Sequence, residues 1–303
     1  MAQIIKNKKR FKRILQANLV GYMFIFPLIL GLAIFTFYPM LQSLIYSFYD
    51  YSGFGRSVFT GLGNYITLLR DEEFLKVMGN TAIYTVISVP MSIVLSYLLA
   101  VFVNKKLKGM SAFRVIYYLP VVIPGIVSGV LWMDFYGYPD GVFNTILKAL
   151  GMESFTFFSV ARTSMFSVIL MGVWGIGGGM ILWLAALKNI PASLYEAAEI
   201  DGAGKLVCFF IITIPMSTPM IFYNLITGVI GGLQFNGTLI YAPRNGTGID
   251  NSIYFIAVKI YKTAFENQSI GLASAEGWVL MVIIACIVGV LFSTSRWVFL
   301  GDD

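Results

Sequence analysis

Charged residues and histidine are scarce in this sequence. Only 12% of its 303 residues are charged and none is histidine, while 58% are hydrophobic and the mean hydropathy is +0.80. A soluble domain carries about 25% charged residues, so the composition indicates a membrane protein. The two cysteines, Cys208 and Cys286, lie in apolar stretches, which is the ordinary place for a small hydrophobic thiol. A disulfide framework and a cysteine–histidine metal site are therefore not expected.

Ionisable side chains are also missing from the interior of the long apolar runs. Those nearest, such as Asp134, Glu276 and Arg296, fall at the ends of the runs. Proton- and ion-coupled carriers usually mark their pathway with such residues inside the membrane. No set of acid, base and nucleophile is evident either, so an enzyme is not expected. A secondary, ion-coupled carrier remains the alternative, because sodium can also be bound by carbonyl and hydroxyl oxygens.

A phosphate-binding loop is missing as well. The stretch DGAGKL is similar to the end of such a loop, but Glu199 stands where the first glycine belongs. Leu206, and not serine or threonine, follows Lys205. If this protein pumps a solute, another subunit must therefore supply the energy.

Charge-free windows long enough to cross a membrane are abundant. About 20 helical residues span the hydrocarbon core, and lipid favours helices because it cannot satisfy free backbone groups. We expect six spans, at residues 18–49, 77–104, 115–133, 163–187, 206–243 and 277–295. The sequence therefore predicts an all-α membrane protein, a six-helix bundle with residues 18–303 in one domain. Pro120 and Pro124 predict a bend in the third span.

The distribution of lysine and arginine predicts the orientation. The first span follows the basic run KNKKRFKR in residues 1–17; it is too long for a signal peptide and shows no cleavage site, so we expect it to be retained. With the N-terminus inside, the cytoplasmic segments 1–17, 104–114, 188–205 and 296–303 hold 13 of the 21 basic residues and 5 of the 15 acidic ones. This bias predicts that both termini are cytoplasmic. The net charge of +6 therefore reflects topology, and a nucleic-acid partner is not expected.

Two small-residue clusters, WGIGGGM and GVIGG, occur in the fourth and fifth spans. Gly175 and Gly179, like Gly228 and Gly232, are four residues apart and would share a helix face. Such glycines allow either close helix packing or a concave wall along a solute path. Nearby amide, hydroxyl and aromatic side chains suit a neutral polyhydroxylated solute, although interfacial anchoring accounts equally well for Trp and Tyr near span ends. The predicted pathway residues are Trp174, Gly175, Gly178, Thr227, Gly228, Gly231 and Gln234.

A short polar helix is expected between the fourth and fifth spans, in SLYEAAEIDGAG. Ser193 and Glu196 have the spacing of a capping box, which predicts a helix start near Leu194. Asp201 and Gly202 should end it, since glycine adopts the positive φ that closes many helices. A helix of about two turns is unstable alone, so this one requires a packing partner.

This loop resembles the EAA loop of permease subunits of binding-protein-dependent ABC importers. Glu196-Ala197-Ala198 is followed after three residues by Gly202, and after nine more by Ile212, Ile214 and Pro215; the family pattern has leucine at the position of Ile214. The stretches YYLPVVIPGIVSGVLW and GLGNYITLLRDEEFLKVMGNTAIYT are similar to the carbohydrate-uptake (maltose- and glycerol-phosphate-type) subfamily. One departure is APRNGTGIDNS, where relatives often have a Gly-Gly-Pro turn.

The resemblance implies a subunit of a bacterial cytoplasmic-membrane importer of sugars or oligosaccharides. Its partners would be a second permease, two cytoplasmic ATPase subunits and an extracellular solute-binding protein. ATP and magnesium would be bound by the ATPase subunits, so this chain needs no cofactor. The resemblance assigns ATPase coupling to Glu196, Ala197, Ala198, Asp201 and Gly202.

Overall fold

A computed structural model describes residues 21–55, 57–105, 108–237 and 245–298. The basic segment 1–17 and Tyr241, one of the aromatic residues near the predicted path, lie outside the described residues. Within them the chain is mostly helical, and the sheet found there is a two-stranded antiparallel hairpin of β1 (Tyr49–Asp50) and β2 (Val58–Phe59).

Three spans are continuous helices. The first runs from Gly21 to Tyr46 and includes a π-helical turn, η1 (Ala33–Phe37), before α2 (Tyr38–Tyr46). The other two are α4 (Glu72–Val103) and α16 (Ile270–Ser293). Both begin several residues before the predicted spans, at 77 and 277, because a search for charge-free windows stops at Lys76 in α4 and at Glu276 in α16.

The other three spans are bent. A bend of 99° separates α5 (Met110–Val122) from α6 (Gly125–Phe135), which confirms the bend predicted from Pro120 and Pro124. A bend of 47° separates α8 (Ala161–Val173) from α9 (Gly177–Lys188). A bend of 61° separates a first part, α11 (Lys205–Cys208), η2 (Phe209–Thr213) and α12 (Ile214–Met216), from α13 (Thr218–Leu233). With each bent pair counted once, the described residues contain the six predicted spans.

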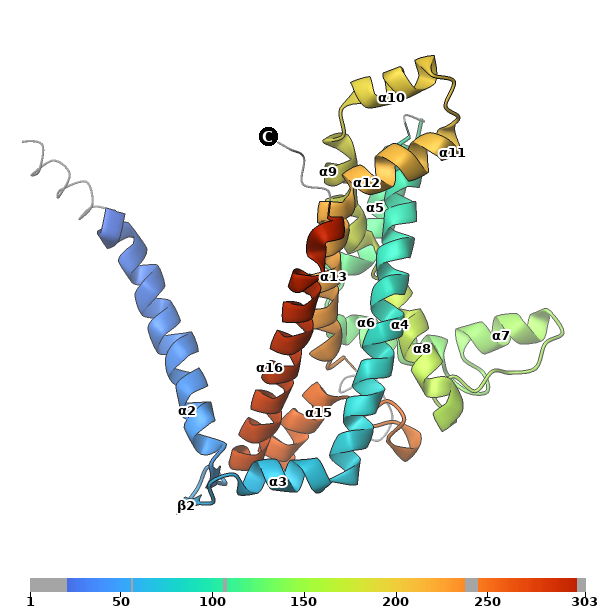
Figure 1. Ribbon diagram of the computed structural model, residues 1–303. Helices are drawn as coiled ribbons and strands as arrows, with labels where there is room; N and C mark the ends of the chain where they lie inside the picture. Colours follow the sequence, from blue (N-terminus) through green and yellow to red (C-terminus); the bar gives the residue numbers. More distant parts are fainter. Residues whose placement is uncertain (1–20, 56, 106–107, 238–244, 299–303) are drawn as a thin grey trace, which may run out of the picture.

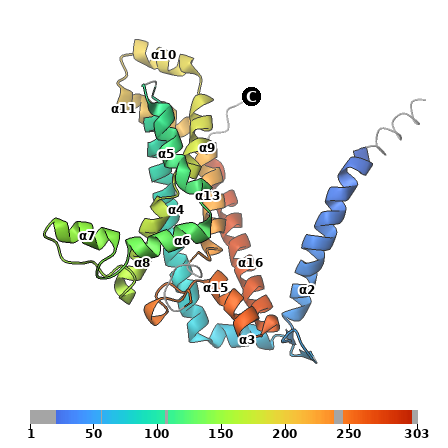
Figure 2. The same cartoon turned by 180° about the vertical axis from the view of Figure 1, so that it is seen from behind.

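Short elements connect the spans at both ends. At one end, α10 (Ala192–Ile200) lies beyond α9 and α11, at the end of the molecule where α16 ends (Figure 1). At the other end lie the β1–β2 hairpin, α3 (Gly63–Arg70) and α15 (Ile256–Tyr261) (Figures 1 and 2). This arrangement agrees with both termini on the cytoplasmic side. The remaining elements are α7 (Val142–Ala149), η3 (Ile249–Asn251), η4 (Lys262–Glu266) and η5 (Ser295–Trp297).

The first span, one of the six expected, stands apart from the other five. It diverges from α16 toward the cytoplasmic end (Figures 1 and 2), and none of its most apolar window is buried. Near the outer end, the indole Nε1 of Trp278 donates a hydrogen bond to Ser43 Oγ at 3.2 Å. A single chain therefore leaves this span almost entirely exposed.

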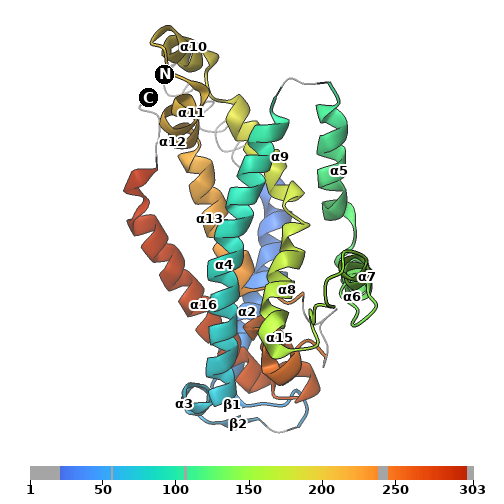
Figure 3. The ribbon, with the colours of Figure 1, turned by 90° about the vertical axis from the view of Figure 1, so that its right-hand side faces the viewer.

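The long helix α4 is the centre of the remaining bundle, with α13, α8 and α9 packed along it (Figure 3). Buried side chains form separate clusters along its length. An inner cluster includes Tyr97, Met180 and Trp183, and an outer one includes Phe74 and Val77. The site described next lies between them.

Candidate functional site

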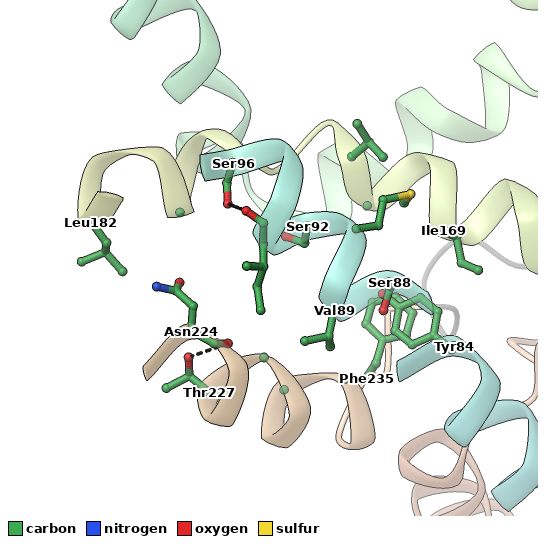
Figure 4. Close-up of a pocket in the computed structure, with 18 residues that line it drawn as sticks. Tyr84, Ser88, Val89, Ser92, Ser96, Ile169, Leu182, Asn224, Thr227 and Phe235 are labelled. Atoms are coloured by element: carbon green, nitrogen blue, oxygen red, sulfur yellow. Dashed lines mark hydrogen bonds between the residues drawn. The ribbon is translucent and has the colours of Figure 1, made fainter. Parts of the chain in front are cut away.

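A cavity of about 460 Å³ lies between α4, α8–α9 and α13 (Figure 4). Ser88, Ser92 and Ser96 line it from α4, and their spacing of four places them on one helix face. Asn224 and Thr227 line the opposite side from α13. Among the described residues that line this cavity, none carries a charge.

The polar groups of the cavity suit a solute that both donates and accepts hydrogen bonds. Asn224 Nδ2 donates to the carbonyl of Met220 at 2.8 Å, and Thr227 Oγ1 donates to the carbonyl of Tyr223 at 2.8 Å. Both side chains keep oxygen lone pairs that can accept further bonds. The cavity can therefore bind hydroxyl groups without taking a charge into the membrane.

Aromatic side chains lie at both ends of the cavity. At the outer end, the Tyr84 ring is stacked on Phe235 with centroids 4.6 Å apart (Figure 4). At the inner end, Trp183 Nε1 donates to Ser96 Oγ at 3.0 Å. Tyr84 and Ser96 are twelve residues apart on one helix, which corresponds to about 18 Å. Sideways the cavity is open, since Ser92, Thr227 and Leu182 are exposed.

Three of the seven predicted pathway residues, Thr227, Gly228 and Gly231, line this cavity. The other four lie elsewhere: Trp174 and Gly175 in the break between α8 and α9, Gly178 against Val121 of α5, and Gln234 exposed at the end of α13. Gly175 and Gly179 were expected to share one face of a straight fourth span. The 47° bend between α8 and α9 interrupts that face. Contact of these residues with solute stays a prediction.

The serine face of α4 and Asn224 were not among the pathway residues predicted from the sequence. The signal was present, because SVPMSIVLS places Ser88, Ser92 and Ser96 four residues apart within an apolar run. Serines with this spacing line one face of a helix. The glycine clusters indicate the walls formed by α9 and α13, and the serines indicate the third wall, which is formed by α4.

Close helix packing accounts for several of the glycines. A Cβ at Gly228 would lie 2.8 Å from a methyl carbon of Val89, and one at Gly232 would lie 3.0 Å from Thr85. At Gly177 an added Cβ would overlap the backbone carbonyl of Tyr117. Both interpretations of the glycine clusters therefore hold for Gly228 and Gly232. These two residues bring α13 against α4, and they also line the cavity.

Trp174 lies in a second hollow, of about 520 Å³, inside the elbow of α5 and α6. Trp132 packs against Trp174 and Phe143 there, with ring centroids 5.8 and 5.9 Å away. The Nε1 atom of Trp132 is buried and has no hydrogen-bond partner within the described residues. This aromatic surface is formed by α6, α7 and the end of α8, and it adjoins the serine-lined cavity at Val173, which lines both hollows.

The helix predicted to couple to an ATPase is α10, at the cytoplasmic end. Glu196, Ala197, Asp201 and Gly202 are exposed and Ala198 is half-buried. Ala192, at the start of α10, follows Pro191 as the N-terminal cap, and no side-chain capping bond is present. The predicted capping box of Ser193 and Glu196 is therefore wrong, and the helix starts two residues earlier than expected. Proline ends the preceding segment and is tolerated at a helix start because it has no N–H to lose.

The end of α10 is as predicted. Gly202 has a φ of +79°, and its N–H donates to the carbonyl of Glu199 at 3.1 Å. The N–H of Ala203 donates to the carbonyl of Ala198 at 2.9 Å. These two bonds form the Schellman motif, which requires a left-handed residue after the helix.

Only a few contacts hold α10 to the bundle. The hydroxyl of Tyr195 is 2.9 Å from that of Thr213 in η2, and no residue of α10 is buried. A hollow of about 510 Å³ lies beneath it, lined among others by Tyr195, Glu199 and Cys208. The helix thus protrudes from the membrane end with most of its surface free for a partner.

The outer end of the bundle contains a cluster of charges in which Lys259 and Glu276 are buried and Asp71 and Glu73 are partly exposed. Lys259 Nζ lies 2.7 Å from Glu73 Oε2, 3.3 Å from Asp71 Oδ2 and 3.9 Å from Glu276 Oε1. Glu276 is fully buried within α16, so the expectation that ionisable residues lie only at span ends is wrong at this position. Burial alone would lower the pKa of Lys259, but the hydrogen bond to Glu73 and the charges of the three carboxylates raise this pKa overall.

Comparison with known families gives one match that covers most of the chain. The family model described as "Binding-protein-dependent transport system inner membrane component" matches residues 60–299. The probable ABC transporter permease protein YesP of Bacillus subtilis (strain 168) is 35% identical over 95% of this chain and 94% of its own length. The lactose transport system permease protein LacF of Rhizobium radiobacter is 32% identical over 96% of this chain and 98% of its own length.

A solved structure shows the same fold. It belongs to a bacterial ABC transporter involved in the import of the acidic polysaccharide alginate. The TM-score is 0.84 at 24% sequence identity, and the match covers 96% of this chain and all of that chain. The bent spans and the diverging first span therefore occur in a fold already seen in an ABC importer.

Proposed function

This chain belongs to the family of inner-membrane components of binding-protein-dependent transport systems, and we propose that it is the sugar-conducting permease subunit of an ATP-driven importer. The observation that carries the proposal is the position of α10. It presents Glu196, Ala197 and Ala198 at the cytoplasmic end of a bundle that encloses an uncharged, hydroxyl-lined cavity. One chain thus supplies a surface for the motor and a path for the solute.

The energy enters through partner subunits. Two ATPase subunits bind ATP and magnesium, and one of them receives α10 of this chain in a groove. Glu196, Ala197, Ala198, Asp201 and Gly202 form the contact. The bonds that fix the end of α10 make it stiff enough to transmit a displacement to α9 and α11, between which it lies in the chain.

A second permease completes the pathway. The central cavity is open on the side where Ser92, Leu182 and Thr227 are exposed. The first span, which has no buried residues in its most apolar window, supplies a further surface for the same partner. An extracellular binding protein delivers the solute to the outer end, near α3 and α15.

The solute is a sugar or a short oligosaccharide. Serine, threonine and asparagine side chains offer donors and acceptors that match sugar hydroxyls, and the described lining contains no charged residue. Permeases similar to this chain include one named for lactose transport. An uncharged lining favours neutral glycosyl units over acidic ones, because an isolated buried charge is costly without a partner.

Reconstitution tests this proposal. The tagged chain is purified from its own membrane with the subunits that accompany it and placed in liposomes with the solute-binding protein outside. We expect uptake of labelled sugar only with ATP inside and the binding protein outside. An ATPase subunit with an inactivated nucleotide site serves as the control. Uptake by this chain alone, driven by an ion gradient, would show that it is a secondary carrier instead.

A further inference from the structure

The short helix α15 joins two features of the outer end. Phe255, at its start, is fully buried and contacts both rings that close the central cavity. Its centroid lies 5.1 Å from that of Tyr84 and 5.6 Å from that of Phe235. Lys259 follows four residues later, about one helical turn along. The charged cluster and the aromatic closure are therefore attached to the same short helix.

Side chains of α4 fix the chain just before α15. Asn80 Nδ2 donates to the carbonyls of Asn251 and Tyr254 at 2.7 and 3.1 Å. Thr81 Oγ1 accepts the backbone N–H of Ile256 at 3.0 Å. These bonds are neutral. Ile256 and Val258 of α15 pack in one apolar cluster with residues of α4 and α16, and Lys259 adds ion pairs to carboxylates of both helices.

Lys259 is surrounded by carboxylates from both of the helices that flank α15. Its side chain is 8% exposed and meets Asp71 and Glu73 at the start of α4 and Glu276 in α16. Without the ammonium group, the fully buried carboxylate of Glu276 would lose its cation and would face Asp71 and Glu73, which are partly exposed. A buried carboxylate without a partner is costly, and the nearby like charges add repulsion that water screens only in part. The carboxylates then stop holding α15 and favour its separation from α4 and α16.

We propose that Lys259 is a positioning residue that locks α15 between α4 and α16 and so holds Phe255 over the outer end of the central cavity. In this arrangement α15 is the outer gate of the permease. The inference rests on the proposed function only in taking the cavity as the solute path. Opening requires α15 to move away from Tyr84 and Phe235, which belong to other parts of the chain.

Accessibility of the cavity tests the gate directly. Cys208 and Cys286 are first replaced in the complete transporter, because both would react with a thiol reagent, and Ser92→Cys is introduced as the reporter. Right-side-out vesicles are then treated with a membrane-impermeant maleimide, without nucleotide or binding protein. We expect Lys259→Met to raise the labelling rate on the order of tenfold, which corresponds to about 1.4 kcal/mol of lost closure. Lys259→Arg should label at nearly the original rate, since it keeps the charge.

Lys262→Met is the matched control. Lys262 lies three residues further along, in η4, and its Nζ is 3.2 Å from Glu266 Oε2 of the same element. Its loss removes an outer ion pair without touching the connection to α4 or α16, so labelling should not change. Equal labelling of Lys259→Met, Lys262→Met and the parent would overturn the gate.

Two further measurements test the gate, one with a double variant and one of ATP hydrolysis. If Lys259→Met does not assemble, Lys259→Met with Glu276→Gln removes one buried charge of each sign; unchanged labelling in this double variant also overturns the gate. ATP hydrolysis without binding protein is measured on the same samples and should rise with the labelling rate. Labelling does not depend on sugar transport, so a change in labelling without any sugar uptake would support the gate and contradict the proposed function.

Discussion

Gly202 provides a sharp test of how α10 works, because its role is purely conformational. Its φ is +79°, and a Cβ added there would meet no atom within 4 Å. A valine at this position therefore causes no clash and only forces the backbone out of the left-handed region. That change removes the two bonds that close α10, from Gly202 to Glu199 and from Ala203 to Ala198.

The cost follows from general backbone energetics. A left-handed conformation costs an ordinary residue about 1–2 kcal/mol, which corresponds to a factor of about 5–30 in the population of the closed helix end. The helix has nine residues and no buried side chain, so little else compensates. We expect Gly202→Val to lower sugar uptake several-fold while leaving membrane insertion and assembly intact. ATP hydrolysis should continue at a higher ratio of ATP to sugar.

The assay is the number of sugar molecules taken up per ATP hydrolysed in proteoliposomes. Gly204→Val is the matched control, since Gly204 has a φ of −73° and a ψ of 163° and likewise has no atom within 4 Å of an added Cβ. Gly202→Asn should retain most of the coupling, because asparagine tolerates the left-handed region. If Gly202→Val and Gly204→Val transport equally well, the geometry of the helix end does not matter and the reasoning fails.

Uptake by Asn224→Leu should fall about tenfold, since an unpaired hydrogen-bonding solute group costs about 1–3 kcal/mol; Trp174→Ala tests the elbow, and unchanged uptake kinetics would remove Trp174 from the pathway. Gly177→Ala should lower the Tm of the purified protein, with a loss of about 1–3 kcal/mol, because the new Cβ overlaps the Tyr117 carbonyl; a wild-type Tm would contradict that close approach. The pKa of Lys259 is raised above its ordinary 10.5, so its stabilisation is fully present below pH 10.5 and is lost as the pH rises through the folded-state pKa. Where the partner carboxylates are ionised, the Tm difference between wild type and Lys259→Met should therefore be constant up to pH 10.5 and shrink above it, and a difference that does not shrink above pH 10.5 would refute this account.

The sequence was sufficient for the features that depend on local composition. Six apolar runs and the lysine and arginine bias predict the spans and their orientation, because hydrophobicity alone decides which segments enter lipid. Gly202 likewise marks the end of α10, since its conformation is set by its own backbone. These features require no knowledge of distant contacts.

Features that depend on tertiary packing could not be predicted in this way. A window without charges cuts the last span at 277 and hides Glu276, whose buried carboxylate is stabilised by the Thr263 hydroxyl and by Lys259 of α15. The bend near Trp174 changes which glycines face the cavity, and no proline in the sequence marks it. Ser193 has the right spacing for a cap, but Pro191 occupies the capping position first.

One wall of the central cavity is an unbroken helix, and the other two walls are bent helix pairs. α4 runs past it without a break of more than 40°, whereas α8–α9 and α12–α13 are bent by 47° and 61°. The chain enters α10 from α9 and leaves it toward α11 and α12. Both bent walls therefore adjoin α10 in the chain, and α4 does not. We therefore expect a displacement of this nine-residue helix to reach both bent walls directly and α4 only through its packing contacts.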